Sequence, residues 1–315
     1  MTRYTDYQKR TIKRIVDNYF STDTDIPVKR MLVADEVGLG KTYVAKGVIR
    51  ALAYRYLCSI AEDKLDEDNT CEFKVMYLCS NLNIAKQNKS KLALNELIDD
   101  NIGDISAYIE NDSMEIQYKE YSHENRSSML YLNELRDNVK AIPIDVLCQE
   151  YNAATGSNEV VDRTLEKRKI RVRVLPVTPA TSIKLDSAGT EKEREYILRL
   201  LKACYPDKGY NFNRSESTLI YNTYGEFFER ESANVEFKAK VDKFRKLLDD
   251  YIKNNTDVKA IIDNIQDLSI EKKNEEEYSK AAEEWKNKWI ALRTAFSIVT
   301  LNAATYNLVI LDEFQ

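Results

Sequence analysis

Eight consecutive residues combine the types that bind a polyphosphate, with two glycines for a tight turn and then a lysine and a threonine. They are Asp35, Glu36, Val37, Gly38, Leu39, Gly40, Lys41 and Thr42. The apolar run 31–34 before them and the helix-like run 43–49 after them predict a strand, a turn and a helix start. Backbone N–H groups and the helix dipole at such a turn attract phosphate. Lys41 would then reach the β- and γ-phosphates of ATP, and Thr42 would ligate Mg²⁺.

A second group of chemically useful residues follows the last apolar run of the chain. Residues 308–311 are all aliphatic and predict a buried strand, and Asp312 and Glu313 come directly after it. A nucleotide triphosphatase needs one carboxylate for the metal ion and another for the attacking water. We therefore expect Asp312 to bind Mg²⁺ and Glu313 to polarise water, although a strand that ends in solvated acids would have the same sequence.

The segments that must position these residues alternate between helix and strand. Apolar residues recur at helical spacing in 7–20, and 41–60 also reads as a helix. An acidic surface loop at 62–72 leads to a buried strand at 74–79, and a further helix is expected through about residue 99. This alternation predicts an α/β fold with a parallel, doubly wound sheet.

The second half of the chain has a different pattern. Apolar and charged residues alternate in 170–177, as in a half-exposed strand. Two apolar stripes at helical spacing then predict a helical hairpin, with a short piece at 258–268 between its arms. We expect four parts: the first part of the nucleotide-binding lobe, an irregular mixed region, a helical insertion and the closing strand, at 1–102, 103–225, 226–303 and 304–315.

Composition narrows the class of protein. The 315 residues are 43% hydrophobic and 31% charged, with a net charge of −5, which suits one sizeable core and an added module. No apolar run approaches the ~20 residues of a membrane span. The amino terminus lacks a signal peptide, and the five cysteines lack CxxC spacing. The expectation is a cytoplasmic protein without membrane partners, zinc or disulfides.

Basic residues gather in three places despite the acidic total. The clusters are at 9–14, at 86–91 and at 167–173. Local clusters matter more than net charge for nucleic-acid binding. The alternative is that each cluster is a solvated surface, and the sequence leaves both readings open.

Together these segments resemble the first motor lobe of superfamily-2 helicases, closest to the Swi/Snf-type bacterial translocases. Residues 35–42 carry the nucleotide-binding motif of that group, with Asp35 at the first glycine position of the general pattern. Gln8 stands where the family places a glutamine that reads the adenine edge, although it could be an ordinary polar helix residue. The resemblance implies a RecA-like P-loop fold with ATP and Mg²⁺ as cofactors.

The closing residues, Asp-Glu-Phe-Gln at 312–315, resemble the Asp-Glu-x-His/Gln box of these helicases. Phe314 departs from the usual alanine, and Gln315 would couple hydrolysis to movement. Ser80 and Asn81 resemble the motif that grips the nucleic-acid backbone, although a simple helix cap would have the same residues. Thr178 is the weakest match, to a Thr-Pro pair that contacts the tracked strand.

The resemblance covers a first lobe only, which makes the enzymatic activity of this chain uncertain. It implies a partner, double-stranded DNA, and a second RecA-like lobe or partner protein that supplies an arginine finger worth roughly 10³–10⁵ in rate. We expect a truncated motor or one half of a split motor, in genome maintenance or phage defence. The rival reading is a P-loop interaction protein that uses ATP as a switch and docks a partner through its helices. A small-molecule kinase is disfavoured, because it would leave Gln8 and the acidic box as coincidences.

Overall fold

The computed structural model describes residues 4–20, 40–80, 88, 92, 127–131, 135, 141–177, 187–210, 224–265 and 275–312. The chain forms two compact units, which are treated separately here. Unit 1 consists of Met1–Asn111, Asn138–Pro176 and Tyr306–Gln315, and unit 2 of Asp112–Asp137 and Val177–Thr305. None of the helices in the described ranges is both long and apolar enough to cross a membrane.

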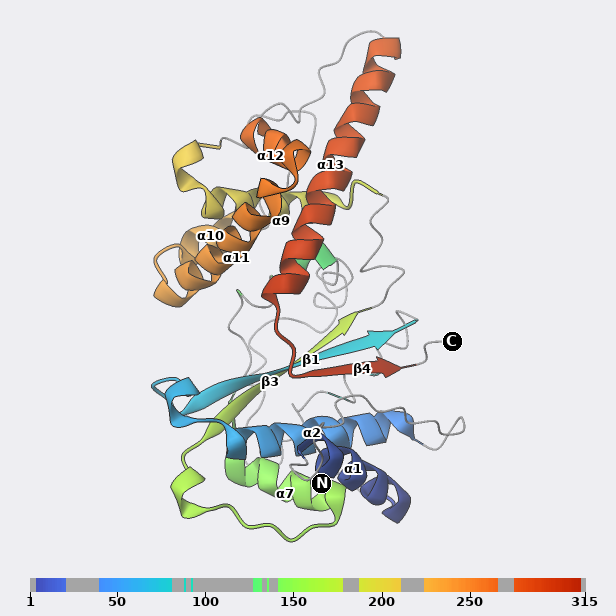
Figure 1. Ribbon diagram of the computed structural model, residues 1–315, viewed down its shortest axis with the longest axis vertical. Helices are drawn as coiled ribbons and strands as arrows, with labels where there is room; N and C mark the ends of the chain where they lie inside the picture. The colour runs from blue at the N-terminus through green and yellow to red at the C-terminus, as the bar shows by residue number, and fades with distance from the viewer. Residues whose placement is uncertain are drawn as a thin grey trace. The chain divides into compact units, whose positions relative to one another are not determined.

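Unit 1 is built on a four-stranded sheet in the order β2-β3-β1-β4. Its strands are β1 (Thr70–Cys79), β2 (Ala141–Pro143), β3 (Lys169–Val177) and β4 (Leu308–Asp312). β4 pairs parallel to β1, and β1 and β3 also run in the same direction (Figure 1). β2 is antiparallel to β3. The α/β class is confirmed, but the sheet is mixed rather than wholly parallel as expected, because β2 enters as a short antiparallel edge.

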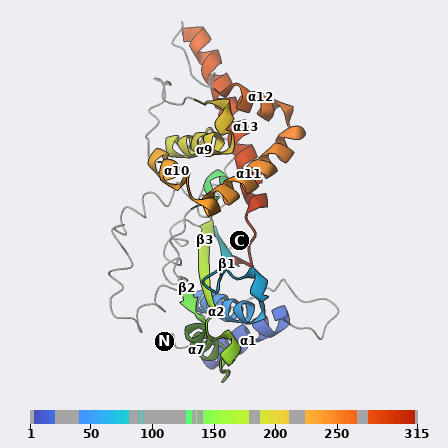
Figure 2. The same cartoon turned by 90° about the vertical axis from the view of Figure 1, so that its left-hand side faces the viewer.

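Three helices of unit 1 lie on one face of this sheet in both views (Figures 1 and 2). They are α1 (Asp6–Phe20), α2 (Lys41–Ser59) and α7 (Ile144–Thr155). α1 packs so closely on α2 that a Cβ atom at Gly47 would lie 2.3 Å from Ile12 Cδ1. A buried ion pair between Arg50 and Glu150 joins α2 to α7. α2 is therefore the central helix of the unit.

β1 starts earlier than the sequence indicates, at Thr70, inside the segment expected to be an acidic loop. Alternate residues of β1 from Cys71 to Cys79 enter the core beneath the helices. Glu72 lies on the opposite face and pairs with Arg173 of β3 at 3.1 Å and with Lys74 at 3.4 Å. These ion pairs allow charged residues in the first half of the strand.

Unit 2 is helical. It contains α9 (Glu191–Cys204), α10 (Gly225–Glu231), α11 (Val235–Lys253), α12 (Thr256–Asp263) and α13 (Glu275–Ala303). The apolar stripe on α11 is buried at Phe237, Val241, Phe244 and Leu248, and the ring centroids of Phe244 on α11 and Phe296 on α13 lie 5.3 Å apart. Within 226–303, the described residues 226–265 and 275–303 are thus mainly helical. The unit is larger than that segment, because α9 belongs to the same core.

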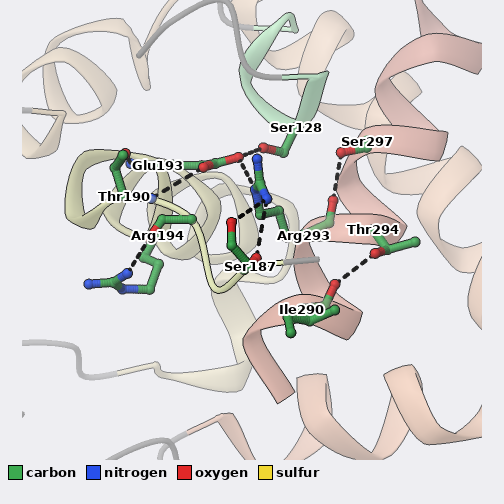
Figure 3. A network of polar contacts seen from close by, with 10 residues as sticks. Ser128, Ser187, Thr190, Glu193, Arg194, Ile290, Arg293, Thr294 and Ser297 are labelled. Carbon is green, nitrogen blue, oxygen red and sulfur yellow. Dashed lines mark hydrogen bonds and ion pairs between the residues drawn. The ribbon is translucent and has the colours of Figure 1, made fainter. Parts of the chain in front are cut away.

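A buried polar network lies inside unit 2 (Figure 3). Glu193 and Arg293 are 0% and 1% exposed, and Arg293 Nε donates to Glu193 Oε1 at 2.6 Å. The Ser128 hydroxyl donates to the same oxygen. Arg293 Nη1 donates to the carbonyl and the hydroxyl of Ser187, each at 3.1 Å. The network therefore connects α13 to α9, to the short 3-10 helix Ser127–Met129 and to the loop at Ser187.

Several expected elements lie outside the described residues. These are the strand at 31–34, the Thr-Pro pair at 178–179 and most of the helix expected after residue 80. Within that last segment the structure describes Asn88 and Leu92, and both are helical.

Candidate nucleotide-binding site

The direction of α2 places its first residues at the carboxyl edge of the sheet. Arg168 Nη1 donates to the carbonyls of Leu57 and Ile60, at 3.1 and 2.9 Å, at the end of α2. The next residue, Lys169, begins β3. Its backbone N–H donates to the carbonyl of Asn69, the residue before β1, at 2.9 Å. The end of α2 is therefore fixed at the amino ends of both strands. At 1.5 Å per residue the helix runs back to the other edge, where the arrowheads lie in Figure 1.

α1 runs in the same direction for a similar reason. The Tyr19 hydroxyl, near the end of α1, donates to the carbonyl of Asn307 at 2.9 Å, and Asn307 immediately precedes β4. The Asn307 side chain in turn accepts a hydrogen bond from the Lys74 N–H at 2.8 Å. Because the end of α1 lies at the amino end of β4, its beginning, which contains Gln8, lies toward the carboxyl edge.

Gln8 and Gly40 are in contact at this edge. Gly40 has a φ of +80°, and a Cβ atom there would lie 2.7 Å from Gln8 Nε2. Glycine is required on both counts, since a side chain would be strained at this φ and would collide with the amide. Gln8 is 7% exposed. The structure thus brings together two residues that the sequence separates widely, and both are predicted nucleotide-binding residues.

A capping box fixes the side chain of Gln8. The side-chain Oε1 of Gln8 accepts a hydrogen bond from the backbone N–H of Thr5 at 3.0 Å. The backbone N–H of Gln8 donates to the Thr5 hydroxyl at 3.3 Å. This reciprocal pair starts α1 and holds the amide carbonyl toward Thr5, with the amide nitrogen toward Gly40. The sequence analysis missed Thr5, although the Thr-x-x-Gln spacing is the signal of a capping box.

The first turn of α2 is suited to an anion. Gly40 is the N-cap, its carbonyl accepts the N–H of Tyr43 at 2.8 Å and of Val44 at 3.1 Å, and it supplies no side-chain cap. The first turn contains no acidic residue. The N–H groups of Lys41 and Thr42 and the positive end of the helix dipole therefore suit a phosphate, beside the half-buried side chains of the same two residues.

Asp312 ends β4 on the sheet face that α2 covers. It is the register partner of Cys79, whose side chain points into the core under the helices. Asp312 Oδ2 accepts a hydrogen bond from the Tyr77 hydroxyl and one from Asn88 Nδ2 at 3.4 Å. Burial, and secondly the bond to Asp312, raises the pKa of Tyr77 above its ordinary value. Tyr77 therefore stays a neutral donor, and the sequence analysis missed it.

Other predicted site residues have different outcomes. Ser80 is exposed directly after β1. Nine predicted site residues lie outside the described part of the chain: Asp35, Glu36, Val37, Gly38, Leu39, Asn81, Thr178, Glu313 and the coupling residue Gln315.

The basic cluster at 167–173 is largely used inside unit 1. Arg168 binds the end of α2, Arg171 pairs with Asp66 at 3.2 Å, and Arg173 pairs with Glu72. Three arginines of the cluster thus stabilise the fold around β3, which favours a structural role over nucleic-acid binding for this cluster.

The described residues suit a metal ion that is bound partly by a nucleotide better than a metal ion that is bound by protein side chains alone. No group of three or more His, Cys, Asp or Glu side chains in the described ranges could hold a metal ion. Mg²⁺ with a nucleotide needs only one or two carboxylates, because phosphate oxygens and water complete its shell. Asp312 and Thr42 carry oxygen atoms of the kind that Mg²⁺ prefers. Comparisons of this chain with protein-family models, with curated proteins and with solved structures found no match.

Proposed function

We propose that this chain is the ATP-binding N-terminal motor lobe, with a RecA-like fold, of a DNA helicase or translocase. One observation carries the proposal: the amide of Gln8 lies against Gly40 where α2 begins, at the sheet edge at which β4 ends in Asp312. An adenine-reading amide, a phosphate-binding turn and a metal-binding carboxylate thus lie along one edge, and each comes from a different element.

Each residue has a distinct role in this proposal. The first-turn N–H groups of α2 and Lys41 hold the phosphates, while Thr42 and Asp312 supply oxygen ligands for Mg²⁺. When bound, Mg²⁺ neutralises charge on the phosphate oxygens. Glu313 orients the attacking water. A second RecA-like lobe supplies the positive charge that the transition state requires.

We expect Gln8→Glu to remove the preference of this site for ATP over GTP. Glutamate keeps the acceptor that caps α1 through Thr5 but lacks the amide donor that lies beside Gly40. A buried polar group left without its partner costs about 1–3 kcal/mol, so the ratio of the two affinities should fall roughly 10-fold or more. Competition of ATP and GTP for a fluorescent nucleotide analogue measures this ratio.

Thr5→Ala is the matched control for that experiment. It removes the hydroxyl half of the capping box, at a cost of about 1 kcal/mol in stability, but leaves the Gln8 amide in place. The ATP preference should persist in this variant. Equal affinities for ATP and GTP in the unchanged protein would contradict adenine recognition by Gln8.

We expect residues 1–315 alone to hydrolyse ATP only at a trace rate, with little stimulation by duplex DNA. Electrostatic stabilisation dominates phosphoryl transfer, and an arginine finger is worth roughly 10³–10⁵ in rate. Adding a second RecA-like lobe, fused or as a separate chain, should raise turnover by that order in a steady-state phosphate-release assay. Fast DNA-stimulated hydrolysis by residues 1–315, lost in Glu313→Gln, would show that the finger comes from this chain or from a second copy.

One feature favours a second function, a nucleotide-dependent switch that docks a protein. Unit 2 has a hydrophobic core of its own, separate from that of unit 1, together with the buried network around Arg293. Duplex-DNA binding at low salt, measured by fluorescence anisotropy, separates the two functions. A motor lobe binds DNA with a salt-dependent affinity, whereas a switch binds ATP and leaves DNA unbound.

A further inference from the structure

We infer that Tyr77 and Asn88 are positioning residues that hold Asp312 for the metal ion. The inference rests on the proposed function, since it assigns residues to the same Mg·ATP site. Of the two carboxylate oxygens of Asp312, Oδ2 is the one that accepts hydrogen bonds from described residues. Its donors are the Tyr77 hydroxyl and Asn88 Nδ2. Oδ1 is therefore the oxygen that remains for Mg²⁺.

Tyr77 is held rigidly in the sheet. Its backbone pairs with Ile310, two residues before Asp312 on the neighbouring parallel strand, so the two side chains are diagonal neighbours on one face. The side chain is 0% exposed and packs in the core beneath the helices. A hydroxyl carried by a fixed ring defines the position of Oδ2 more narrowly than a flexible side chain would.

Asn88, from a third segment of the chain, binds both Tyr77 and Asp312. Its Nδ2 donates to the Tyr77 oxygen at 2.8 Å and to Asp312 Oδ2 at 3.4 Å, and the residue is 6% exposed. The amide therefore fixes the tyrosine and the carboxylate together. Two donors on one oxygen leave the carboxylate a single orientation.

Replacement of an outer residue that orients a metal ligand commonly reduces metal affinity by roughly 10–100-fold. The competing explanation is that Asp312 and Asn88 only satisfy a buried tyrosine hydroxyl, which would otherwise lack a partner. The two explanations differ in what the hydroxyl controls. A positioning role changes the Mg²⁺ requirement of nucleotide binding, whereas a structural role changes only the free energy of unfolding.

The test removes the hydroxyl and keeps the ring, in Tyr77→Phe. A fluorescent ATP analogue is bound at a series of Mg²⁺ concentrations and, separately, in EDTA. We expect the Mg²⁺ concentration for half-maximal binding to rise roughly 10-fold, with metal-free binding unchanged. Asn88→Leu changes the other donor, from a different segment, and should shift the Mg²⁺ midpoint in the same direction.

Tyr151→Phe is the matched control. Tyr151 is also buried in unit 1, at 2% exposure, but its ring packs against that of Tyr54, with the centroids 4.8 Å apart, so removal of its hydroxyl should leave the Mg²⁺ midpoint unchanged. A wild-type midpoint in Tyr77→Phe and in Asn88→Leu would overturn the positioning role while the proposed function stands. Nucleotide binding by the unchanged protein that ignores Mg²⁺ would overturn both.

Discussion

Replacement of Lys41 by alanine is expected to reduce the affinity for Mg·ATP by more than roughly 100-fold, or about 2.7 kcal/mol. Lys41 is the first residue of α2, directly after the turn at Gly40, where the helix dipole also favours an anion. The ammonium group adds charge-assisted hydrogen bonds to the phosphates, and each of these contributes about 1.5–3 kcal/mol. Equilibrium titration with a fluorescent ATP analogue measures the loss.

Lys13→Ala is a suitable control for Lys41→Ala. Lys13 lies on the exposed surface of α1 and pairs with Asp17 at 3.3 Å, an interaction that contributes little to stability. Its replacement should leave nucleotide affinity unchanged. If Lys41→Ala binds the analogue as tightly as the unchanged protein does, the assignment of the turn to phosphate is wrong.

Replacement of Arg293 by alanine is expected to destabilise unit 2 by about 3–5 kcal/mol. The change leaves the Glu193 carboxylate buried without its cation, and it also removes both hydrogen bonds to Ser187. An uncompensated buried charge is among the most destabilising defects in a protein interior. Chemical denaturation followed by tryptophan fluorescence reports on this unit, since Trp285 and Trp289 both lie on α13.

Thr294→Ala provides the comparison from the adjacent position. The Thr294 hydroxyl donates to the Ile290 carbonyl within its own helix, so its loss should change stability by less than about 1 kcal/mol. A joint replacement of Glu193 and Arg293 by leucine and methionine should recover much of the loss, because it removes both charges. Equal stabilities of Arg293→Ala and Thr294→Ala would contradict the importance of the buried pair.

The sequence predicts the elements whose pattern is local. The helix in 7–20 follows from its apolar spacing, and the strand in 170–177 follows from alternating apolar and charged residues. The early start of β1 has no such signal. Glu72 reads as a loop residue, and its pairing with Arg173 on a distant strand makes that position favourable.

The candidate site shows the same limit. The turn at Gly40 and the acid at Asp312 carry recognisable patterns, and the structure places both toward the carboxyl edge of the sheet. Tyr77 stands in an apolar strand and reads as core, while Asn88 has no pattern at all. Their role depends on a contact between three segments, which no periodicity can indicate.

The pairing of β1 with β4 affects the order in which the protein can fold during synthesis. The Lys74 N–H and the Asn307 side chain that bind each other are separated by 233 positions, and most of unit 2 lies between them. All of unit 2 is therefore synthesised before β4, and until β4 follows, β1 lacks one of its neighbours. Contacts between residues so distant in sequence form slowly. The edge of β1 that is not yet paired with β4 can meanwhile associate with other chains. The carboxylate at Asp312 reaches its place only when β4 joins β1, so the nucleotide site is completed after all of unit 2 has been synthesised.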